Sequence, residues 1–256
     1  MNGFVNILWL SLQMENTQIE KLKDIKGIIF DYGGTIDSRG VHWSEIIYDG
    51  YKSAGLEISK DIFRDAYVYA ERELAKVRHI LPEHNFYDLL LIKMRIELSY
   101  LAANGVIFEN DIDRYARPIA EYCYNQAKQC VEEARVVLQS LYEKFPLVLV
   151  SNFYGNVEAV LSDFKIRHFF REIIESAVVG VRKPDPKIFA LGVEALGFKP
   201  EEVLVIGDSY KKDIVPAESI GCRVLWLKGK GWTADEDAVM HHAILKSLEQ
   251  VLDVVF

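Results

Sequence analysis

Six polar residues that could carry out chemistry lie where short apolar runs of the chain end, or in the loops that follow. They are Asp31, Ser151, Asn152, Lys183, Asp208 and Asp213. Carboxylates gathered in one place repel one another, and oxygen ligands with room for water are what Mg²⁺ prefers. A lysine ammonium neutralises a phosphoryl group, and a serine hydroxyl with nearby amides binds its oxygens. The set predicts that Asp31 attacks a phosphoryl group and forms an acyl phosphate.

The apolar runs themselves predict buried strands of a parallel sheet. They cover residues 27–30, 147–150, 173–178, 203–206 and 224–227. The helical patterns between them cover 156–165, 186–197 and about 213–221. Strands that are apolar throughout and alternate with helices predict an α/β fold with a doubly wound parallel sheet. In such a sheet the carboxyl ends of the strands meet along one edge, and this is where the polar residues fall.

A long segment between the first two predicted strands, residues 41–134, contains no strand-like run and is mostly helical in period. Because a segment of this length cannot be a loop, we expect an all-helical cap inserted above the edge of the sheet. The expected organisation is therefore a catalytic core of residues 21–40 and 135–256, a helical cap of residues 41–134, and an N-terminal extension of residues 1–20.

Several motifs resemble those of the haloacid dehalogenase superfamily of hydrolases, in the branch with a helical cap after the first strand. Residues 31–35 read DYGGT, residues 180–189 read GVRKPDPKIF and residues 205–214 read VIGDSYKKDI. Each motif is weak alone, but their order and their positions at strand ends make the combination specific. The resemblance covers roughly residues 26–252, including a C-terminal helix expected over 243–251.

The resemblance implies roles for the residues of the phosphoryl site. Asp31 corresponds to the nucleophile of the family, and Lys183 to the residue that balances the charge of the phosphoryl group. Ser151, with Asn152 beside it, corresponds to the position that binds the phosphoryl oxygens. The implied substrate is a small phosphorylated metabolite.

The resemblance also implies a magnesium site. Asp31 and Asp208 would be the carboxylate ligands, and the backbone carbonyl of Gly33 would complete the protein's share of the coordination. Asp213 would support the metal shell or its water. The implied cofactor is Mg²⁺.

Gly33 departs from the pattern of the family's phosphatases. These enzymes usually carry a second aspartate two residues after the nucleophile, and it protonates the leaving group. Relatives that cleave carbon–halogen or carbon–phosphorus bonds also lack this aspartate, so glycine here does not mean inactivity. It does make efficient hydrolysis of alkyl phosphates doubtful, and Asp37 is the nearest carboxylate that could replace the acid.

Two other functions fit parts of the pattern. A dehalogenase also uses an aspartate nucleophile but has little use for a metal site, whereas Asp208 in its GDSxxxD setting favours a metal. A catalytically weak relative that binds a phosphoryl ligand or a partner protein is supported by Gly33. No GxxxxGK[ST] or GxGxxG loop indicates a nucleoside triphosphate or dinucleotide cofactor.

The composition narrows the class of protein further. The formal net charge of −8 argues against a protein that binds the phosphate backbone of nucleic acids. No apolar run approaches the length needed to span a bilayer, so we expect no membrane association. Three cysteines without a CxxC pair are too few for a disulfide framework, and a reducing, cytoplasmic location is expected.

Overall fold

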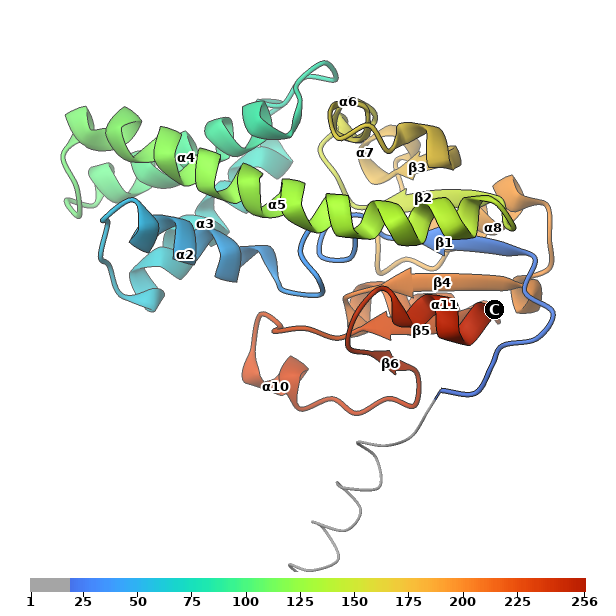
Figure 1. Ribbon diagram of the computed structural model, residues 1–256. Coiled ribbons are helices and arrows are strands. Elements are labelled where there is room, and N and C mark those ends of the chain that lie inside the picture. The colour runs from blue at the N-terminus through green and yellow to red at the C-terminus, as the bar shows by residue number, and fades with distance from the viewer. Residues whose placement is uncertain (1–18) are drawn as a thin grey trace, which may run out of the picture.

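The computed structural model describes residues 19–256, so the N-terminal extension expected over 1–20 lies almost entirely outside the described residues. These residues form a six-stranded parallel sheet with the order β3-β2-β1-β4-β5-β6 (Figure 1). The strands are β1 (Gly27–Phe30), β2 (Leu147–Ser151), β3 (Phe170–Glu175), β4 (Val203–Gly207), β5 (Arg223–Leu227) and β6 (Ile244–Leu245). The predicted α/β fold with a doubly wound parallel sheet is confirmed.

Helices cover the sheet and build the insertion between β1 and β2. The helices of the insertion are α2 (Trp43–Ser53), α3 (Lys60–Lys76), α4 (Phe86–Ala103) and the first part of α5 (Ile112–Tyr142). The other helices are α6 (Val157–Asp163), α7 (Ser176–Val179), α8 (Lys187–Leu196), α9 (Val215–Ser219), α10 (Ala234–Asp237) and α11 (Gln250–Val255). Short 3₁₀ turns lie at Glu109–Asp111, Arg167–Phe169 and Pro200–Glu202, and a π-helical turn lies at Tyr210–Ile214.

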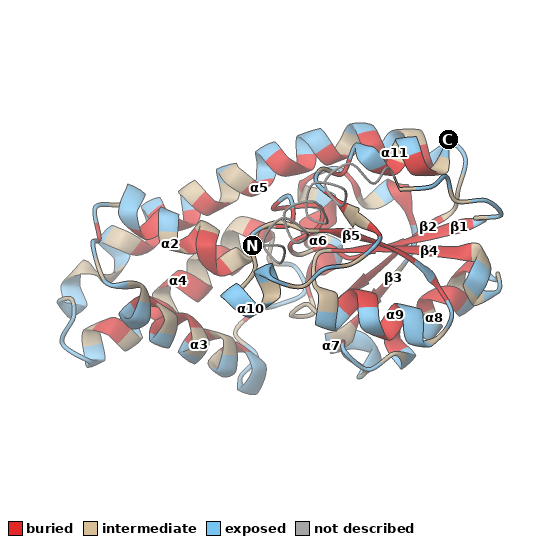
Figure 2. Ribbon diagram, turned by 90° about the horizontal axis from the view of Figure 1, so that it is seen from below, coloured by how far each residue is buried: buried red, intermediate tan, exposed pale blue. Residues whose placement is uncertain are grey.

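Alternate residues of each strand face opposite sides of the sheet, and each side has its own apolar core. In β1, Ile28 and Phe30 face one core and Ile29 faces the other. The last turns of α5 and the helix α11 cover the first face, whereas α8 and α9 cover the second (Figure 2). Because both faces are buried, the strands are apolar throughout, which is why they could be recognised in the sequence.

The long helix α5 connects the cap to the core. It is continuous over 31 residues, and it runs from the side of α2 and α4 to the face of the sheet (Figure 1). The expected boundary between residues 134 and 135 falls inside this helix, so the division into cap and core stays a prediction. The insertion itself is all-helical, as expected. None of the described helices combines the length and the apolar composition needed to cross a membrane.

The third strand ends earlier than predicted. A strand was expected over 173–178, whereas β3 covers Phe170–Glu175 and the helix α7 follows at once. The pairing of β3 with β2 ends at Ser151 and Glu175, because β2 itself ends there. Beyond residue 175 the chain has no strand to pair with, and it turns into a helix instead.

The predicted C-terminal helix over 243–251 is wrong. Residues 244–245 form the edge strand β6, and α11 begins only at Gln250. Ile244 and Leu245 pair with Trp226 and Leu227 of β5, so the free edge of the sheet takes up this apolar pair. The pairing to a distant strand overrides the local helical pattern.

Candidate active site

Asp31 is the first residue after β1, at the carboxyl edge of the sheet. Its backbone N–H donates to the carbonyl oxygen of Ile206 on β4 at 2.9 Å, which fixes it against the neighbouring strand. Its carboxyl group is buried and accepts hydrogen bonds from Lys183 Nζ at 2.5 Å and from the Thr35 hydroxyl at 3.3 Å. Burial raises the pKa of Asp31, Lys183 opposes this shift, and the nearby carboxylate of Asp213 adds to it.

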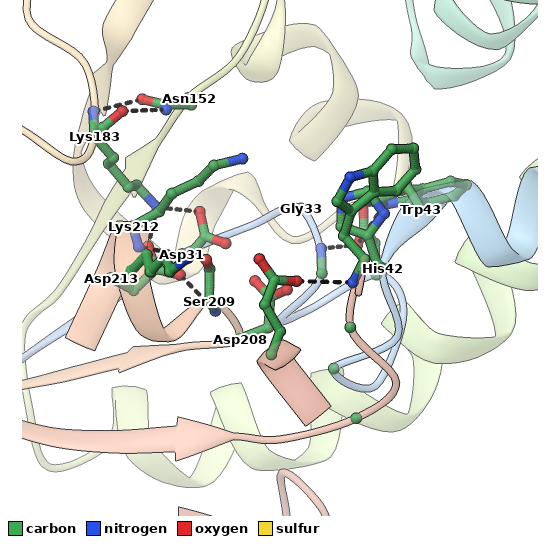
Figure 3. A pocket seen from close by; sticks show the side chains of 18 of the residues that line it. Asp31, Gly33, His42, Trp43, Asn152, Lys183, Asp208, Ser209, Lys212 and Asp213 are labelled. Carbon is green, nitrogen blue, oxygen red and sulfur yellow. Dashed lines mark hydrogen bonds and ion pairs between the residues drawn. The ribbon is translucent and has the colours of Figure 1, made fainter. Parts of the chain in front are cut away.

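Lys183 lies between two carboxylates. Its Nζ atom is 2.5 Å from Asp31 Oδ1 and 2.6 Å from Asp213 Oδ1. Burial disfavours the ammonium form, but the two carboxylates outweigh burial and raise the pKa of Lys183. The side chain of Asn152 accepts a hydrogen bond from the Lys183 N–H at 2.9 Å and donates one to its carbonyl oxygen at 3.0 Å (Figure 3). Asn152 therefore positions Lys183, and its expected contact with substrate stays a prediction.

Ser151 is the last residue of β2 and faces the same cavity as Asp31 and Lys183. This cavity lies between cap and core and has a volume of about 780 Å³. The loop after Ser151 is held by Glu175, whose carboxylate accepts hydrogen bonds from the N–H groups of Gly155 at 2.5 Å and Val157 at 3.4 Å. The structure thus brings all the expected phosphoryl-site residues to one end of the cavity.

Asp31, Asp208 and Asp213 form what we call the carboxylate cluster. One oxygen atom of each lies within 4.8 Å of the others. Asp213 is held in place by the Ser209 N–H, which donates to its Oδ2 atom at 2.9 Å. Burial and the negative charges of Asp31 and Asp213 raise the pKa of Asp208 well above its ordinary value. The cluster exceeds the charge of Lys183, so it is suited to a divalent cation bound by oxygen atoms.

Two adjacent glycines beside the cluster have opposite surroundings. Gly34 has a φ of +99°, and a Cβ atom there would lie 2.3 Å from the carboxyl carbon of Asp208, so only glycine fits. Gly33 lies outside the left-handed region, and a Cβ atom there would meet no described atom within 4 Å. The position where related phosphatases carry their acid is therefore open space. The role of the Gly33 carbonyl as a metal ligand stays a prediction.

Asp37, the nearest candidate for a replacement acid, is fully buried. Its carboxylate accepts hydrogen bonds from the Gly34 N–H at 2.7 Å and from Trp43 Nε1, which lies 3.1 Å from both oxygens. Burial raises the pKa of Asp37 to about 7. Asp37 lines the cavity, but the Gly34 N–H and Trp43 Nε1 occupy its carboxyl oxygens, and these contacts favour a role in holding the loop of Gly34.

Sequence reasoning missed a charged pair on the cap side of the cavity. Lys93 of α4 is buried and forms an ion pair with Glu71 of α3. The Tyr154 hydroxyl donates to both carboxylate oxygens of Glu71, at 3.1 and 3.3 Å, and the Lys93 ammonium lies 4.2 Å from the ring centre of Tyr67. A signal existed, because Lys93 interrupts the apolar run 89–94, and a lysine inside such a run needs a buried partner.

A segment after β5, residues 228–239, closes one side of the cavity, and we call it the strap. The Lys230 carbonyl oxygen accepts a hydrogen bond from the N–H of His42 at 2.8 Å, and that of Trp232 accepts one from Arg64 at 2.5 Å. The Trp232 ring lies 5.1 Å from the ring of His42 and 5.4 Å from that of Tyr67. The strap therefore ties the core to the cap beside the cavity mouth.

A second group of possible metal ligands, Glu218, His241 and His242, lies outside the lining of the cavity. The Nδ1 atom of His241 accepts a hydrogen bond from the Ala243 N–H at 3.2 Å, so the neutral ring carries its proton on Nε2. That nitrogen lies 3.2 Å from Glu218 Oε1. Both ring nitrogens are satisfied by the protein, and we assign no metal here.

Comparisons with known proteins agree with this geometry. The profile of the haloacid dehalogenase-like hydrolase family matches residues 25–221. Glyceraldehyde 3-phosphate phosphatase of Pyrococcus furiosus is 33% identical over 181 residues, which cover 68% of this chain and 69% of that protein. The haloacid dehalogenase-like hydrolase domain-containing protein 3 of the mouse is 29% identical over 53% of this chain and 57% of its own length.

Solved structures show the same fold. A dehalogenase crystallised as an intermediate complex superposes with a TM-score of 0.59 at 15% identity, covering 91% of this chain and 98% of the dehalogenase. A predicted phosphoglycolate phosphatase from Haemophilus somnus gives a TM-score of 0.52 at 19% identity, covering 91% and 99%. The profile match extends over more than half of the chain and includes the strand ends that carry the carboxylate cluster. The chain belongs to the haloacid dehalogenase-like hydrolase family.

Proposed function

We propose that the protein is a Mg²⁺-dependent phosphatase of small phosphorylated metabolites, and that Asp31 forms an aspartyl phosphate during turnover. The observation that carries this proposal is the buried contact of Asp31 with Lys183 inside the carboxylate cluster, at one end of a cavity. Relatives named as phosphatases of a phosphorylated three-carbon sugar support the substrate class.

The residues present fit a magnesium ion. The carboxylate cluster offers only oxygen ligands, and burial together with the charges of Asp31 and Asp213 raises the pKa of Asp208, which a bound cation would oppose. Asp31, Asp208 and the carbonyl of Gly33 would hold the ion, with Asp213 in support. When bound, magnesium would neutralise part of the negative charge on the phosphoryl group and orient it.

The side chains divide the work of the reaction. A carboxylate oxygen of Asp31 attacks phosphorus, and the bond to the leaving oxygen breaks. The Lys183 ammonium balances the charge of the phosphoryl oxygens, and the Ser151 hydroxyl donates a hydrogen bond to one of them. A water molecule then attacks the phosphorus of the aspartyl phosphate, releasing inorganic phosphate and restoring Asp31.

Gly33 determines which leaving groups depart readily. Without a carboxylic acid at this position, a basic alkoxide leaves without a proton donor, whereas an aryl oxide or a carboxylate needs none. We therefore expect aryl and acyl phosphates to react faster than alkyl phosphates. The enclosed position of Asp37 supports this expectation.

The test of this mechanism is the Asp31→Asn variant, assayed with p-nitrophenyl phosphate and Mg²⁺. Turnover should fall by at least about 10³-fold, because the nucleophile is lost. Borohydride reduction during turnover, followed by peptide mass spectrometry, should modify Asp31 in the unaltered protein. The Asp185→Asn variant is the control, because Asp185 is exposed and its side chain caps the Lys187 N–H, which asparagine can also do. A label on another residue, or robust turnover by Asp31→Asn, would refute the mechanism.

Halide release and phosphate binding separate the alternatives. A dehalogenase would release halide from 2-haloacids in the presence of EDTA, and a phosphoryl-binding protein without useful turnover would bind phosphate but hydrolyse no ester. The presence of Asp208 and Asp213 beside Asp31 favours the phosphatase, because a dehalogenase has no need for a crowded set of carboxylates.

A further inference from the structure

The cavity above Asp31 is large for a three-carbon sugar phosphate. Its volume of about 780 Å³ lies in the upper part of the range of roughly 300–1,000 Å³ that is typical of pockets burying drug-sized ligands. The cavity extends from the carboxylate cluster to the cap helices α3 and α4. A substrate that fills it must therefore carry a body well beyond its phosphoryl group.

The wall of the cavity is rich in aromatic side chains. Rings from the cap, from the loop after β2 and from the strap line it: Trp43, Tyr67, Phe86, Phe153 and Trp232. These rings are fixed by one another, since Trp43 lies 5.3 Å from Phe86 and Tyr67 lies 5.4 Å from Trp232. Rigid aromatic faces and edges are complementary to a planar ring, which can pack against them with little loss of conformational freedom.

Glu71 places an open hydrogen-bond acceptor in this aromatic wall. Its Oε1 atom receives the Lys93 ammonium and the Tyr154 hydroxyl, whereas Oε2 has a single hydrogen bond within residues 19–256, from Tyr154 at 3.3 Å. The side chain of Glu71 is 38% exposed and lines the cavity, whereas that of Lys93 is 5% exposed. Lys93 therefore neutralises Glu71 from its buried side, and the free lone pairs of Glu71 are available to a ligand in the cavity.

The charge of this pair selects for a neutral donor. Burial opposes ionisation of Glu71, but Lys93, Tyr154 and Lys212 outweigh it and lower the pKa of Glu71, so the group accepts hydrogen bonds and donates none. Because Lys93 already balances the carboxylate, a ligand cation would gain little attraction there. A hydroxyl or ring amino group fits, and a second anion does not.

The same short stretch of chain contributes to both ends of this part of the cavity. Ser151 ends β2, and Phe153 and Tyr154 lie on the loop that follows it. The Cα atoms of Ser151 and Tyr154 are at most about 11 Å apart. The end of β2 and its loop therefore supply the expected phosphoryl contact, a ring contact and the hydroxyl that donates to Glu71.

We propose that the substrate is a phosphate ester with an aromatic or heteroaromatic body, and that a neutral hydrogen-bond donor on its ring binds Glu71. This inference rests on the proposed function, which places the phosphoryl group at Asp31. It extends that function by naming the part of the substrate that the cap recognises.

The test is calorimetric titration with phosphonates, which bind without being hydrolysed, in the presence of Mg²⁺. Benzylphosphonate should bind about tenfold tighter than ethylphosphonate, because the ring buries additional apolar surface. The better of the 3- and 4-aminobenzylphosphonates should bind about tenfold tighter than its methyl isostere, because its neutral amino group donates to a carboxylate. The 4-(aminomethyl) compound, which is cationic, should show no such gain. Equal affinity for ethyl- and benzylphosphonate, or for both amino isomers and their methyl isosteres, would overturn the inference.

A matched pair of variants locates the acceptor. In Glu71→Gln, the amide oxygen has to serve Lys93 and Tyr154, so the amide NH₂ faces the cavity and the preference for the amino ligand should fall to within about twofold. Glu73→Gln makes the same change on the same helix but outside the cavity, where Glu73 contacts His79, and it should keep the preference. A preference that persists in a folded Glu71→Gln protein would exclude Glu71 as the acceptor. If that variant does not fold, the phosphonate series on the unaltered protein still tests whether an aromatic body and a neutral ring donor are recognised.

Failure of this inference differs from failure of the proposed function. Turnover of p-nitrophenyl phosphate with no selectivity among the phosphonates would remove the aromatic substrate and leave the phosphatase. Absence of both turnover and phosphonate binding would remove both.

Discussion

The cavity has a floor, formed by the carboxylate cluster and Lys183, and a cap wall, formed by Glu71 and Lys93. These two regions hold buried charge in different ways. On the floor, the carboxylate cluster faces the ammonium of Lys183, so negative charge is in excess. On the cap wall, Glu71 and Lys93 are matched one to one, and the Tyr154 hydroxyl also donates to the carboxylate. The excess on the floor is tolerable only with a bound cation or a bound proton, whereas the cap pair needs neither. The difference supports the two proposals, that the chemistry takes place on the floor and that the cap recognises the body of the substrate.

The cap also contains a carboxyl group that has no cation paired with it. This group is held by a bound proton instead of a bound cation. Glu97 of α4 is fully buried, and its Oε1 atom has no hydrogen-bond partner among the described residues. Its neighbour Tyr51 donates to Oε2 at 2.9 Å. Burial raises the pKa of Glu97 to about 7, so a proton does here what a metal ion would do on the floor. Three substitutions test this contrast.

The largest effect is expected from adding the missing acid to the floor. Gly33→Asp should raise turnover of an alkyl phosphate by about 10²-fold, the lower end of what a positioned general acid contributes, and should change aryl phosphates much less. The substitution is sterically open, because a Cβ atom at Gly33 meets no described atom within 4 Å and φ is not left-handed. The measurement is kcat/KM for ethyl phosphate and p-nitrophenyl phosphate, each with Mg²⁺.

Gly33→Ala is the matched control, because it adds the Cβ atom without the acid and should leave the alkyl-to-aryl ratio unchanged. Gly34→Ala sharpens the comparison, since its Cβ atom would collide with Asp208 and the variant should lose stability. An unaltered protein that hydrolyses both esters at similar rates would show that another residue supplies the proton.

A smaller effect is expected from removing one carboxylate of the floor. Asp208→Asn should weaken Mg²⁺ binding by about tenfold or more, because a carboxylate ligand becomes a neutral amide. In EDTA the same variant should be more stable than the unaltered protein, because burial and the charges of Asp31 and Asp213, which raise the pKa of Asp208, no longer act on a carboxylate there. Calorimetry with Mg²⁺ and thermal melts in EDTA measure the two effects.

A loss of Mg²⁺ affinity together with a gain of stability in EDTA distinguishes a metal site from a structural cluster. A residue that only supports the fold would lose stability in EDTA as well. The exposed Asp185, changed to asparagine, should alter neither quantity. Unchanged Mg²⁺ affinity in folded Asp208→Asn would remove Asp208 from the proposed ligands.

The floor could be predicted from the sequence because parallel strands simplify the problem. Asp31, Ser151 and Asp208 each lie where an apolar run ends, and strand ends meet at one edge whatever the loops between them do. The position of Lys183 required more, since it lies on a loop that Asn152 holds in place. The motif around Lys183 resembled that of a known family, and this resemblance, rather than the strand pattern, predicted that Lys183 lies beside Asp31.

The cap wall could not be predicted in the same way. Apolar residues surround α4 on several sides, so its helical period does not show which side faces the cavity. Glu71 and Lys93 meet only because α3 and α4 pack in a particular orientation, which depends on the tertiary structure. The edge strand β6 was missed for a related reason, because Ile244 and Leu245 become a strand only beside β5.

The smallest effect on turnover is expected at Glu97, the carboxyl group that the cap holds as an acid, so this prediction concerns stability. Its pKa of about 7 lies above the ordinary value of 4.5, so the folded protein keeps a proton that the unfolded chain releases. The resulting stabilisation is complete below about pH 4 and is lost as the pH rises through 7. Glu97→Gln has no proton to lose, so relative to the unaltered protein it should gain roughly 2–3 kcal/mol of unfolding free energy between pH 5 and pH 8. Urea denaturation at both pH values measures this gain, and the same substitution at the exposed Glu121 of α5 should show none. Parallel pH profiles for Glu97→Gln and the unaltered protein would mean that Glu97 is ionised over the whole range from pH 5 to pH 8. The cap would then tolerate a buried carboxylate that has neither a paired cation nor a proton, and the contrast with the floor would fail.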